Sequence, residues 1–168
     1  HVVAIFEEAG RASGEAFGYF LPQAIVGTCV NLFCSWLADS RPLKYFLVAL
    51  ISGLLLGISG ILFLEHWWGY AMMVLGFGAG AGLWGVISNL SFIRHFGRTH
   101  LGEITGLNLA VSVVASAIGP VLFSHGYDVF GTFHASVYIS LCITAALLVV
   151  SISTKLTEPF VASRGSLR

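Results

Sequence analysis

The chain has 168 residues, of which 57% are hydrophobic and 10% are charged. A soluble domain carries about 25% charged residues, so this sequence has too few charges to cover a globular surface in water. Its net charge is zero, whereas a nucleic-acid-binding protein needs a surplus of basic residues. The composition therefore excludes a soluble enzyme, a disordered tail and a nucleic-acid partner. It favours helices in a lipid bilayer, where the 20 glycines are well tolerated.

Five windows of the sequence contain no charged residue. They are residues 16–38, 45–64, 66–93, 104–127 and 129–154. Each is long enough to span a membrane, because a helix needs about 20 residues to cross the hydrocarbon core. A buried soluble helix can imitate one such window but not five in succession, and the windows do not alternate as β-barrel strands do. We therefore predict an all-α membrane bundle of five transmembrane helices in one domain, with residues 155–168 as a cytoplasmic tail.

The first window carries a polar face and the second does not. At 100° per residue, one face of the first window holds Gly27, Thr28, Asn31 and Ser35. The second window has a seam of small residues, which permits close helix packing and predicts a supporting role. The members of that seam are Gly53, Gly57 and Gly60.

The third window combines a polar line with a run of glycines. The line consists of Gly78, Gly82, Gly85 and Asn89, with Trp84 and Ser88 beside it. The glycine run, at positions 76, 78, 80 and 82, is expected to weaken this helix and to let it bend. A nucleotide-binding glycine motif would need a preceding strand and charged partners, which the sequence lacks.

The fourth window repeats the polar pattern and the fifth shows a weaker form of it. The face of the fourth window consists of Thr105, Asn108, Ser112, Ser116 and Gly119. The fifth has a mild stripe at Ser136, Ser140 and Thr144. We interpret the fifth helix, like the second, as a support rather than as part of a lining.

Two interpretations of these polar faces remain open. Amides are costly in hydrocarbon unless they are paired or hydrated, so the faces either join neighbouring helices by hydrogen bonds or line a solute pathway. Helix pairing is favoured for any single residue, and three polar faces together favour a pathway. The candidate cavity residues are Thr28, Asn31, Trp84, Ser88, Asn89, Asn108 and Ser112. The three asparagines fall near the same ends of their helices, which predicts a shared water-filled vestibule.

The positions of Lys and Arg predict the orientation in the membrane. Seven of them flank one side of the predicted bundle: Arg41, Lys44, Arg94, Arg98, Lys155, Arg164 and Arg168. The opposite side has Arg11 alone. Short cytoplasmic loops are enriched in these residues, so we expect the C-terminus in the cytoplasm and the N-terminal end outside.

The sequence indicates no catalytic, metal or cofactor site. Cys29, Cys34 and Cys142 lie singly in apolar runs, and no Cys or His pair has the spacing of a zinc site. The windows contain no paired carboxylates and no Ser–His–Asp arrangement. We therefore expect that the protein is not an enzyme and that it binds neither a metal nor a cofactor.

Three segments resemble one transporter family. Ser35–Arg41 followed by Pro42–Lys44 resembles the cytoplasmic signature loop of the major facilitator superfamily. Ala117–Pro120 and Gly126–Phe133 are similar to the end of that family's eleventh helix and its last outer turn. His1–Gly10 is similar to the end of its seventh helix. The nearest branch contains the monocarboxylate and oxalate/formate carriers.

The resemblance implies a fold, a function and a missing partner. The five spans would be helices eight to twelve of a twelve-helix secondary transporter in the plasma membrane or the bacterial inner membrane, and the N-terminal half would be absent. Such a transporter moves a small solute, in this branch an organic anion, by alternating access. Asp39 and Arg41 would belong to its gating loop. The alternative is a structural or sensory membrane protein that transports nothing.

Overall fold

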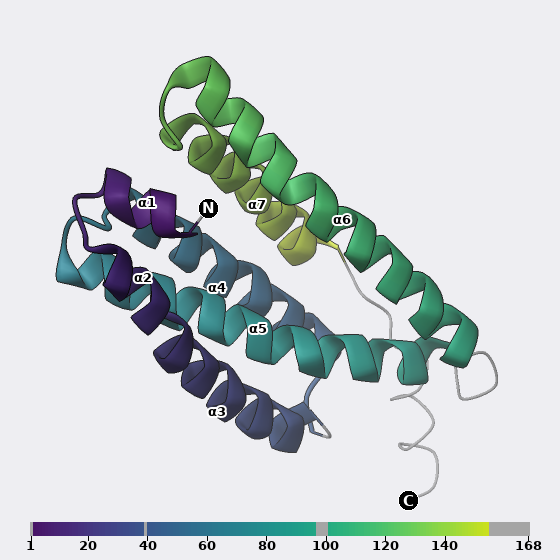
Figure 1. The fold of residues 1–168 in the computed structure, drawn as a ribbon. Coiled ribbons are helices and arrows are strands. Elements are labelled where there is room, and N and C mark those ends of the chain that lie inside the picture. Colours follow the sequence, from purple (N-terminus) through teal and green to yellow (C-terminus); the bar gives the residue numbers. More distant parts are fainter. Residues whose placement is uncertain (1, 39, 97–100, 155–168) are drawn as a thin grey trace, which may run out of the picture.

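The computed structural model describes residues 2–38, 40–96 and 101–154, and over these ranges short turns join one helix to the next (Figure 1). The helices are α1 (Val2–Glu8), α2 (Ser13–Gly18), α3 (Phe20–Ala38), α4 (Leu43–Leu62), α5 (Trp67–Phe96), α6 (Leu101–Phe130) and α7 (His134–Ser153). The prediction of an all-α bundle is confirmed.

Five helical segments are long and apolar enough to cross a membrane. They are Ser13–Ala38, Leu43–Leu62, Trp67–Phe92, Gly102–Phe130 and His134–Ser153. Each overlaps one of the five uncharged windows, so the predicted number of transmembrane helices is confirmed. Helices satisfy their backbone hydrogen bonds internally, as hydrocarbon requires. The protein is an integral membrane protein.

The first spanning segment is nearly continuous although it is divided at Tyr19. The Tyr19 N–H donates to the Glu15 carbonyl oxygen at 3.0 Å, and the Gln23 N–H donates to the Tyr19 carbonyl oxygen at 3.2 Å. The hydrogen-bond ladder therefore continues from α2 into α3. A separate turn lies between α1 and α2 at Gly10, whose φ of 73° is a conformation that glycine adopts most readily.

The bundle has two ends, which we name after the basic residues found there. The Arg11 end holds α1, the α4–α5 turn and the α6–α7 turn, and the Lys44 end holds the α3–α4 connection (Figure 1). A buried apolar cluster lies at each end, between α3, α4 and α5 at the Lys44 end and between α1, α2 and α5 at the Arg11 end. At the Lys44 end it consists of Ala38, Leu43, Phe46, Leu50, Leu83, Val86 and Ile87. At the Arg11 end it consists of Phe6, Ala16, Tyr19, Leu64, Met73 and Val74.

The turn between α6 and α7 lies later than the single charge at Asp128 suggested. Helix α6 continues through Asp128 to Phe130, and the chain turns at Gly131, whose φ is 68°. The Gly131 N–H donates to the Tyr127 carbonyl oxygen at 2.7 Å, so the glycine ends the helix in a left-handed conformation. The helix ends at the glycine and not at the carboxylate, because glycine readily adopts the left-handed conformation that the reversal needs.

Glycines of α5 bring its backbone close to α4. An added Cβ at Gly53 of α4 would lie 3.3 Å from the Gly76 carbonyl oxygen and 3.6 Å from the Gly80 backbone nitrogen. An added Cβ at Gly76 would overlap the backbone of Gly57. This contact is the most extensive between any two helices, and that between α3 and α5 follows.

The other glycines of α5 lie against α3. An added Cβ at Gly27 of α3 would lie 3.2 Å from the Gly78 carbonyl oxygen, and one at Gly82 would overlap the Gly27 carbonyl oxygen. Residues two positions apart point about 200° apart around a helix, so alternate glycines serve α4 and α3 in turn. The glycine run, which the sequence suggested as a place of bending, forms two close-packing surfaces on one continuous helix.

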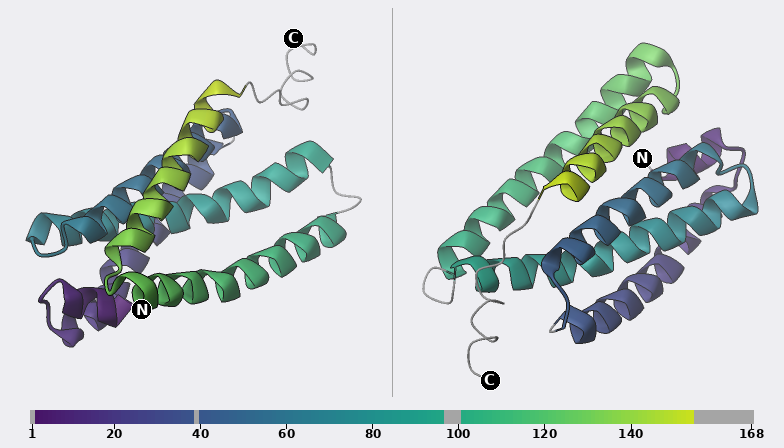
Figure 2. Two further views of the ribbon diagram at one scale, coloured as in Figure 1. Left: turned by 90° about the horizontal axis from the view of Figure 1, so that it is seen from above. Right: turned by 180° about the vertical axis from the view of Figure 1, so that it is seen from behind.

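Helices α6 and α7 form a second layer. Helix α7 packs along α4, and α6 meets the rest of the structure mainly near its two ends (Figure 2). None of the most apolar part of α6 is buried, whereas half of the corresponding part of α5 is. Helix α6 therefore presents most of its surface away from the helices that the structure describes.

Candidate functional site: the α3–α5 groove

A groove runs along the face shared by α3 and α5. Its volume is about 570 Å³, and its polar lining groups are Gln23, Thr28 and Asn31. The rest of the lining is apolar or small, including Gly27 and Gly82, whose backbones lie in close contact. Of the α3 face predicted from Gly27, Thr28, Asn31 and Ser35, the first three residues line this groove.

Asn31 is half-buried and joins the two helices. Its Nδ2 donates a hydrogen bond to the Gly82 carbonyl oxygen at 3.0 Å. An added Cβ at Gly85 would lie 2.7 Å from that Nδ2, so the glycine leaves room for the amide. The amide nitrogen of Asn31 therefore pairs α3 with α5, as the helix-pairing interpretation predicts. The same bond holds the Asn31 side chain at the groove.

The hydroxyl groups among the candidate residues bond within their own helices. Thr28 Oγ1 donates to the Ala24 carbonyl oxygen at 2.9 Å. Ser88 Oγ donates to the Trp84 carbonyl oxygen at 2.8 Å, and Ser112 Oγ bonds that of Asn108 at the same distance. This back-bonding satisfies a hydroxyl in hydrocarbon without a partner helix. The oxygens of these groups keep a free lone pair as acceptors.

A second hollow adjoins the groove. It is lined by Gln23, Leu50, Leu54, Phe77 and Trp84 among others, and its volume is about 380 Å³. Trp84 is half exposed there. Gln23 borders both hollows and was missed in the sequence analysis, although it is an uncharged amide inside the first window. Its position one turn before Gly27 was the available signal.

The predicted common vestibule of three asparagines is not assembled by the described residues. Asn108 and Ser112 lie on the half-buried side of α6, and α6 lies on the opposite side of α4 and α5 from α3 (Figures 1 and 2). Asn89 belongs to α5, but its side chain is outside what the structure describes. The structure therefore places Thr28 and Asn31 in the groove and Trp84 in the adjoining hollow, and it separates all three from Asn108.

The α3–α4 connection contains a contact that the sequence did not reveal. Asp39 lies outside the described residues, and Arg41 is exposed. Lys44 Nζ, in the first turn of α4, donates to the carbonyl oxygens of Ile152 at 2.7 Å and Thr154 at 2.8 Å. These carbonyls lie at the end of α7, where helix carbonyls lack partners within the helix and a cation is favoured by the helix dipole.

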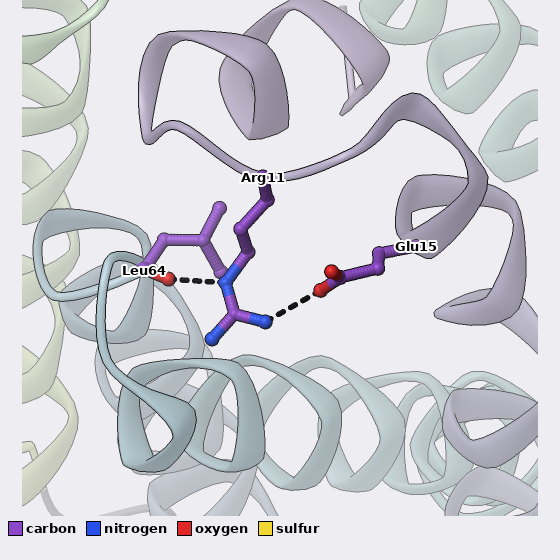
Figure 3. A network of polar contacts seen from close by, with 3 residues as sticks. All are labelled: Arg11, Glu15 and Leu64. Atoms are coloured by element: carbon purple, nitrogen blue, oxygen red, sulfur yellow. Dashed lines mark hydrogen bonds and ion pairs between the residues drawn. The ribbon is translucent and has the colours of Figure 1, made fainter.

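Arg11 plays the matching part at the other end of the bundle (Figure 3). Its Nε donates to the Leu64 carbonyl oxygen, just after α4, at 2.5 Å, and its Nη1 forms an ion pair with Glu15 at 2.6 Å. The guanidinium also lies over the Tyr70 ring, 5.5 Å from the centroid. The sequence had indicated only that Arg11 was the single basic residue on its side.

Metal-binding and thiol chemistry have little support in the geometry. Over residues 2–38, 40–96 and 101–154, no group of three or more His, Cys, Asp or Glu side chains is placed to hold a metal ion. Cys29, Cys34 and Cys142 are free thiols.

Comparison with known proteins leaves the geometry as the basis for a function. No protein-family model, no curated protein and no solved structure matches this chain.

Proposed function

We propose that this chain is the C-terminal part of a secondary transporter of the major facilitator type and that it contributes the α3–α5 groove to a solute pathway. The observation that carries the proposal is this groove, in which two amides and a hydroxyl line a hollow between two membrane-crossing helices. Polar groups at membrane depth most often belong to a pathway or a buried contact. The resemblance of Ser35–Lys44 to the family's signature loop gives the groove its place, on the eighth and tenth helices.

The proposal includes an orientation. The Lys44 end faces the cytoplasm, together with the C-terminus, because seven of the eight Lys and Arg residues flank that side. The membrane is the plasma membrane or the bacterial inner membrane. A cysteine introduced at Gly10 or Glu65 is expected to react with an impermeant maleimide in intact cells, and one at Ser40 only after permeabilisation. The opposite pattern would reverse the orientation.

The proposal also includes a partner and a class of substrate. An N-terminal half of six or seven further helices would complete the transporter. The polar lining of the groove consists of uncharged groups, so this half contacts a solute by hydrogen bonds and apolar surface. Small organic anions, which the resemblance implies, would then find their opposite charge in the N-terminal half.

A structural membrane protein is the second candidate, and a specific observation favours it. Asn31 is bonded to Gly82, and the hydroxyls of Thr28 and Ser88 are bonded within their own helices. Such bonds satisfy the polar groups without any solute. Under this hypothesis the polar faces contribute to stability and not to transport.

An uptake experiment separates the two candidates. The longest reading frame that contains this chain is reconstituted into liposomes and tested with a panel of small mono- and dicarboxylates. Thr28→Val removes a groove hydroxyl and is expected to lower uptake about tenfold, the effect of one lost hydrogen bond to a bound solute. Cys29→Val changes the neighbouring exposed residue and serves as the matched control. Uptake by neither the variants nor the parent would favour the structural candidate, and equal uptake by the two variants would show that the Thr28 hydroxyl does not contact the solute.

A further inference from the structure

The burial of α7 is uneven along its length. At its start, Phe133 and Val137 are 6% and 1% exposed. Between Val137 and Ser151 no residue of the helix is buried, and Ser151, at the other end, is 6% exposed. Helix α7 is therefore most deeply buried at the Arg11 end, packs lightly through its middle, and is buried again only at Ser151.

The anchored end of α7 is held by several independent contacts. The Phe133 N–H donates to Glu8 Oε2 at 3.3 Å, an acceptor of the sign that a helix N-terminus favours. The Phe133 ring lies 4.6 Å from the Tyr127 ring, centroid to centroid. Gly126 of α6 lies directly against Ser136. The start of α7 thus contacts both α1 and α6.

The middle of α7 lies on α4 without using its hydroxyl groups to bind it. Ser140 Oγ donates to the Ser136 carbonyl oxygen at 2.8 Å, and Thr144 Oγ1 donates to that of Ser140 at 2.7 Å. Both residues are half-buried. In lipid, apolar contact between helices gains little over contact with lipid chains, so this stretch resists separation weakly.

The far end of α7 is held by Lys44. Its ammonium binds two terminal carbonyl oxygens of α7, those of Ile152 and Thr154, and the bonds are exposed. Lys44 is the counterpart of Arg11, but Arg11 also has an ion pair and an aromatic ring around it. An exposed ammonium exchanges its partners for water more readily than a guanidinium held on three sides.

A buried polar atom weakens the same end. Ser151 Oγ is buried and, among the described residues, has no hydrogen-bond partner. The hydroxyls of Ser140, Thr144 and Thr154 on the same helix all bond the carbonyl four residues earlier. Burial without a partner destabilises the packed arrangement. Lys44 therefore holds the end of α7 against α4, although the Ser151 hydroxyl would gain a hydrogen bond if that end moved away.

We propose that α7 is a hinged lever that pivots at Phe133–Val137 and is latched to α4 by Lys44. Release of the ammonium from the terminal carbonyls lets the Lys44 end of α7 move away from α4 and lets the Ser151 hydroxyl find a partner. The Arg11 end stays closed during this movement. The proposal concerns motion within this chain, so it stands or fails separately from the transport function.

Distances between pairs of spin labels, measured by double electron–electron resonance, test the lever. In the full chain with Cys29, Cys34 and Cys142 replaced by Ala, one label pair is placed near the latch, at Ala49 and Val149, and another near the hinge, at Phe63 and Tyr138. All four label positions are exposed. In nanodiscs, Lys44→Met is expected to raise the ratio of open to closed distances at the latch pair about tenfold, as loss of one charge-assisted bond implies. The hinge pair is expected to keep its distance.

Two further variants keep the test decisive. Lys44→Arg keeps the charge and the donors and is expected to restore the closed distance. Ser151→Ala removes the unpartnered hydroxyl and is expected to lower the ratio of open to closed distances in the otherwise unchanged protein. An unchanged latch pair in Lys44→Met would overturn the proposal, as would equal changes at both label pairs or an opening caused by Ser151→Ala.

Discussion

Helices α5 and α6 are equal in length, at 30 residues each, and both contain a strongly apolar stretch, but half of that stretch is buried in α5 and none of it in α6. Apolar character therefore does not decide which helix is central. In lipid, an apolar side chain gains as much from a lipid chain as from a neighbouring helix. The difference between α5 and α6 must lie in how closely their backbones can be approached.

Glycine supplies that difference. At Gly76 and Gly82 of α5, an added Cβ would overlap the backbone of α4 or α3. At Gly106 and Gly119 of α6, an added Cβ would have no atom within 4 Å. Close approach brings many backbone atoms into van der Waals contact, which is the main force between helices in a membrane. The same residue type thus marks a contact surface in α5 and, except at Gly126 beside α7, an open surface in α6.

The largest effect is expected from Gly76→Ala. The new methyl group overlaps the backbone of Gly57 and Gly53, which cannot move aside as a flexible side chain can. We expect α4 and α5 to separate slightly and the free energy of unfolding to fall by about 3 kcal/mol. Unfolding by SDS, followed by far-ultraviolet circular dichroism and by steric trapping, measures the loss.

Gly106→Ala is the matched control in α6. It adds the same methyl group where nothing lies within 4 Å, so the stability should stay within about 0.5 kcal/mol of the parent protein. Equal losses in the two variants would mean that backbone approach does not distinguish α5 from α6.

The sequence predicted the helices well and their neighbours poorly. The absence of charge over 20 or more residues depends only on the solvent, so windows such as 45–64 located their helices directly. Which helices touch depends on atoms far apart in the chain. Helical periodicity predicts that Gly76 and Gly78 face two different helices, but it does not predict which helices these are. The shared depth of Asn108 and Asn31 predicted a common vestibule, whereas the structure puts α4 and α5 between their helices.

Contacts at helix ends were hidden from the sequence for the same reason. Lys44 binds carbonyls 108 and 110 residues away, and Arg11 binds one 53 residues away. Every residue has a backbone carbonyl, so no sequence motif could predict which carbonyls Lys44 and Arg11 bind. What the sequence did contain was the isolation of Arg11 as the one basic residue on its side.

Arg11→Met should have the next largest effect. The side chain is 19% exposed, and its loss leaves the carbonyl after α4 without its charged donor. We expect the free energy of unfolding to fall by about 2 kcal/mol, the range for a hydrogen bond to a charged group. Glu15→Gln removes only the partner that is half exposed and is expected to change stability by less than about 1 kcal/mol. A larger loss from Glu15→Gln would assign the stabilisation to the ion pair.

Asn31→Leu and Gly85→Ala test the hydrogen bond between Asn31 and Gly82 across the α3–α5 seam. Leu lacks the Nδ2 donor, and the methyl group of Ala at position 85 occupies the space that Nδ2 needs. Each variant is expected to lose about 1 kcal/mol, typical of an interhelical hydrogen bond in a membrane. Because both remove the same bond, the double variant should lose less than the sum of the two. Strict additivity in this double-mutant cycle would contradict the contact.

Asn108→Leu is expected to have the smallest effect on stability and to be the most informative about function. Asn108 lies on α6, in the stretch that has no buried residue, so replacing it should change the free energy of unfolding by no more than about 0.5 kcal/mol. If the half-buried side of α6 lines a pathway completed by an N-terminal half, Asn108→Leu in the full-length protein should still lower uptake, because a polar group is lost from a water-filled face. Stability and uptake measured on the same variant separate the two roles. Lost stability with normal uptake per folded molecule would make Asn108 a packing residue and would leave the α3–α5 groove as the polar lining of the pathway in this half.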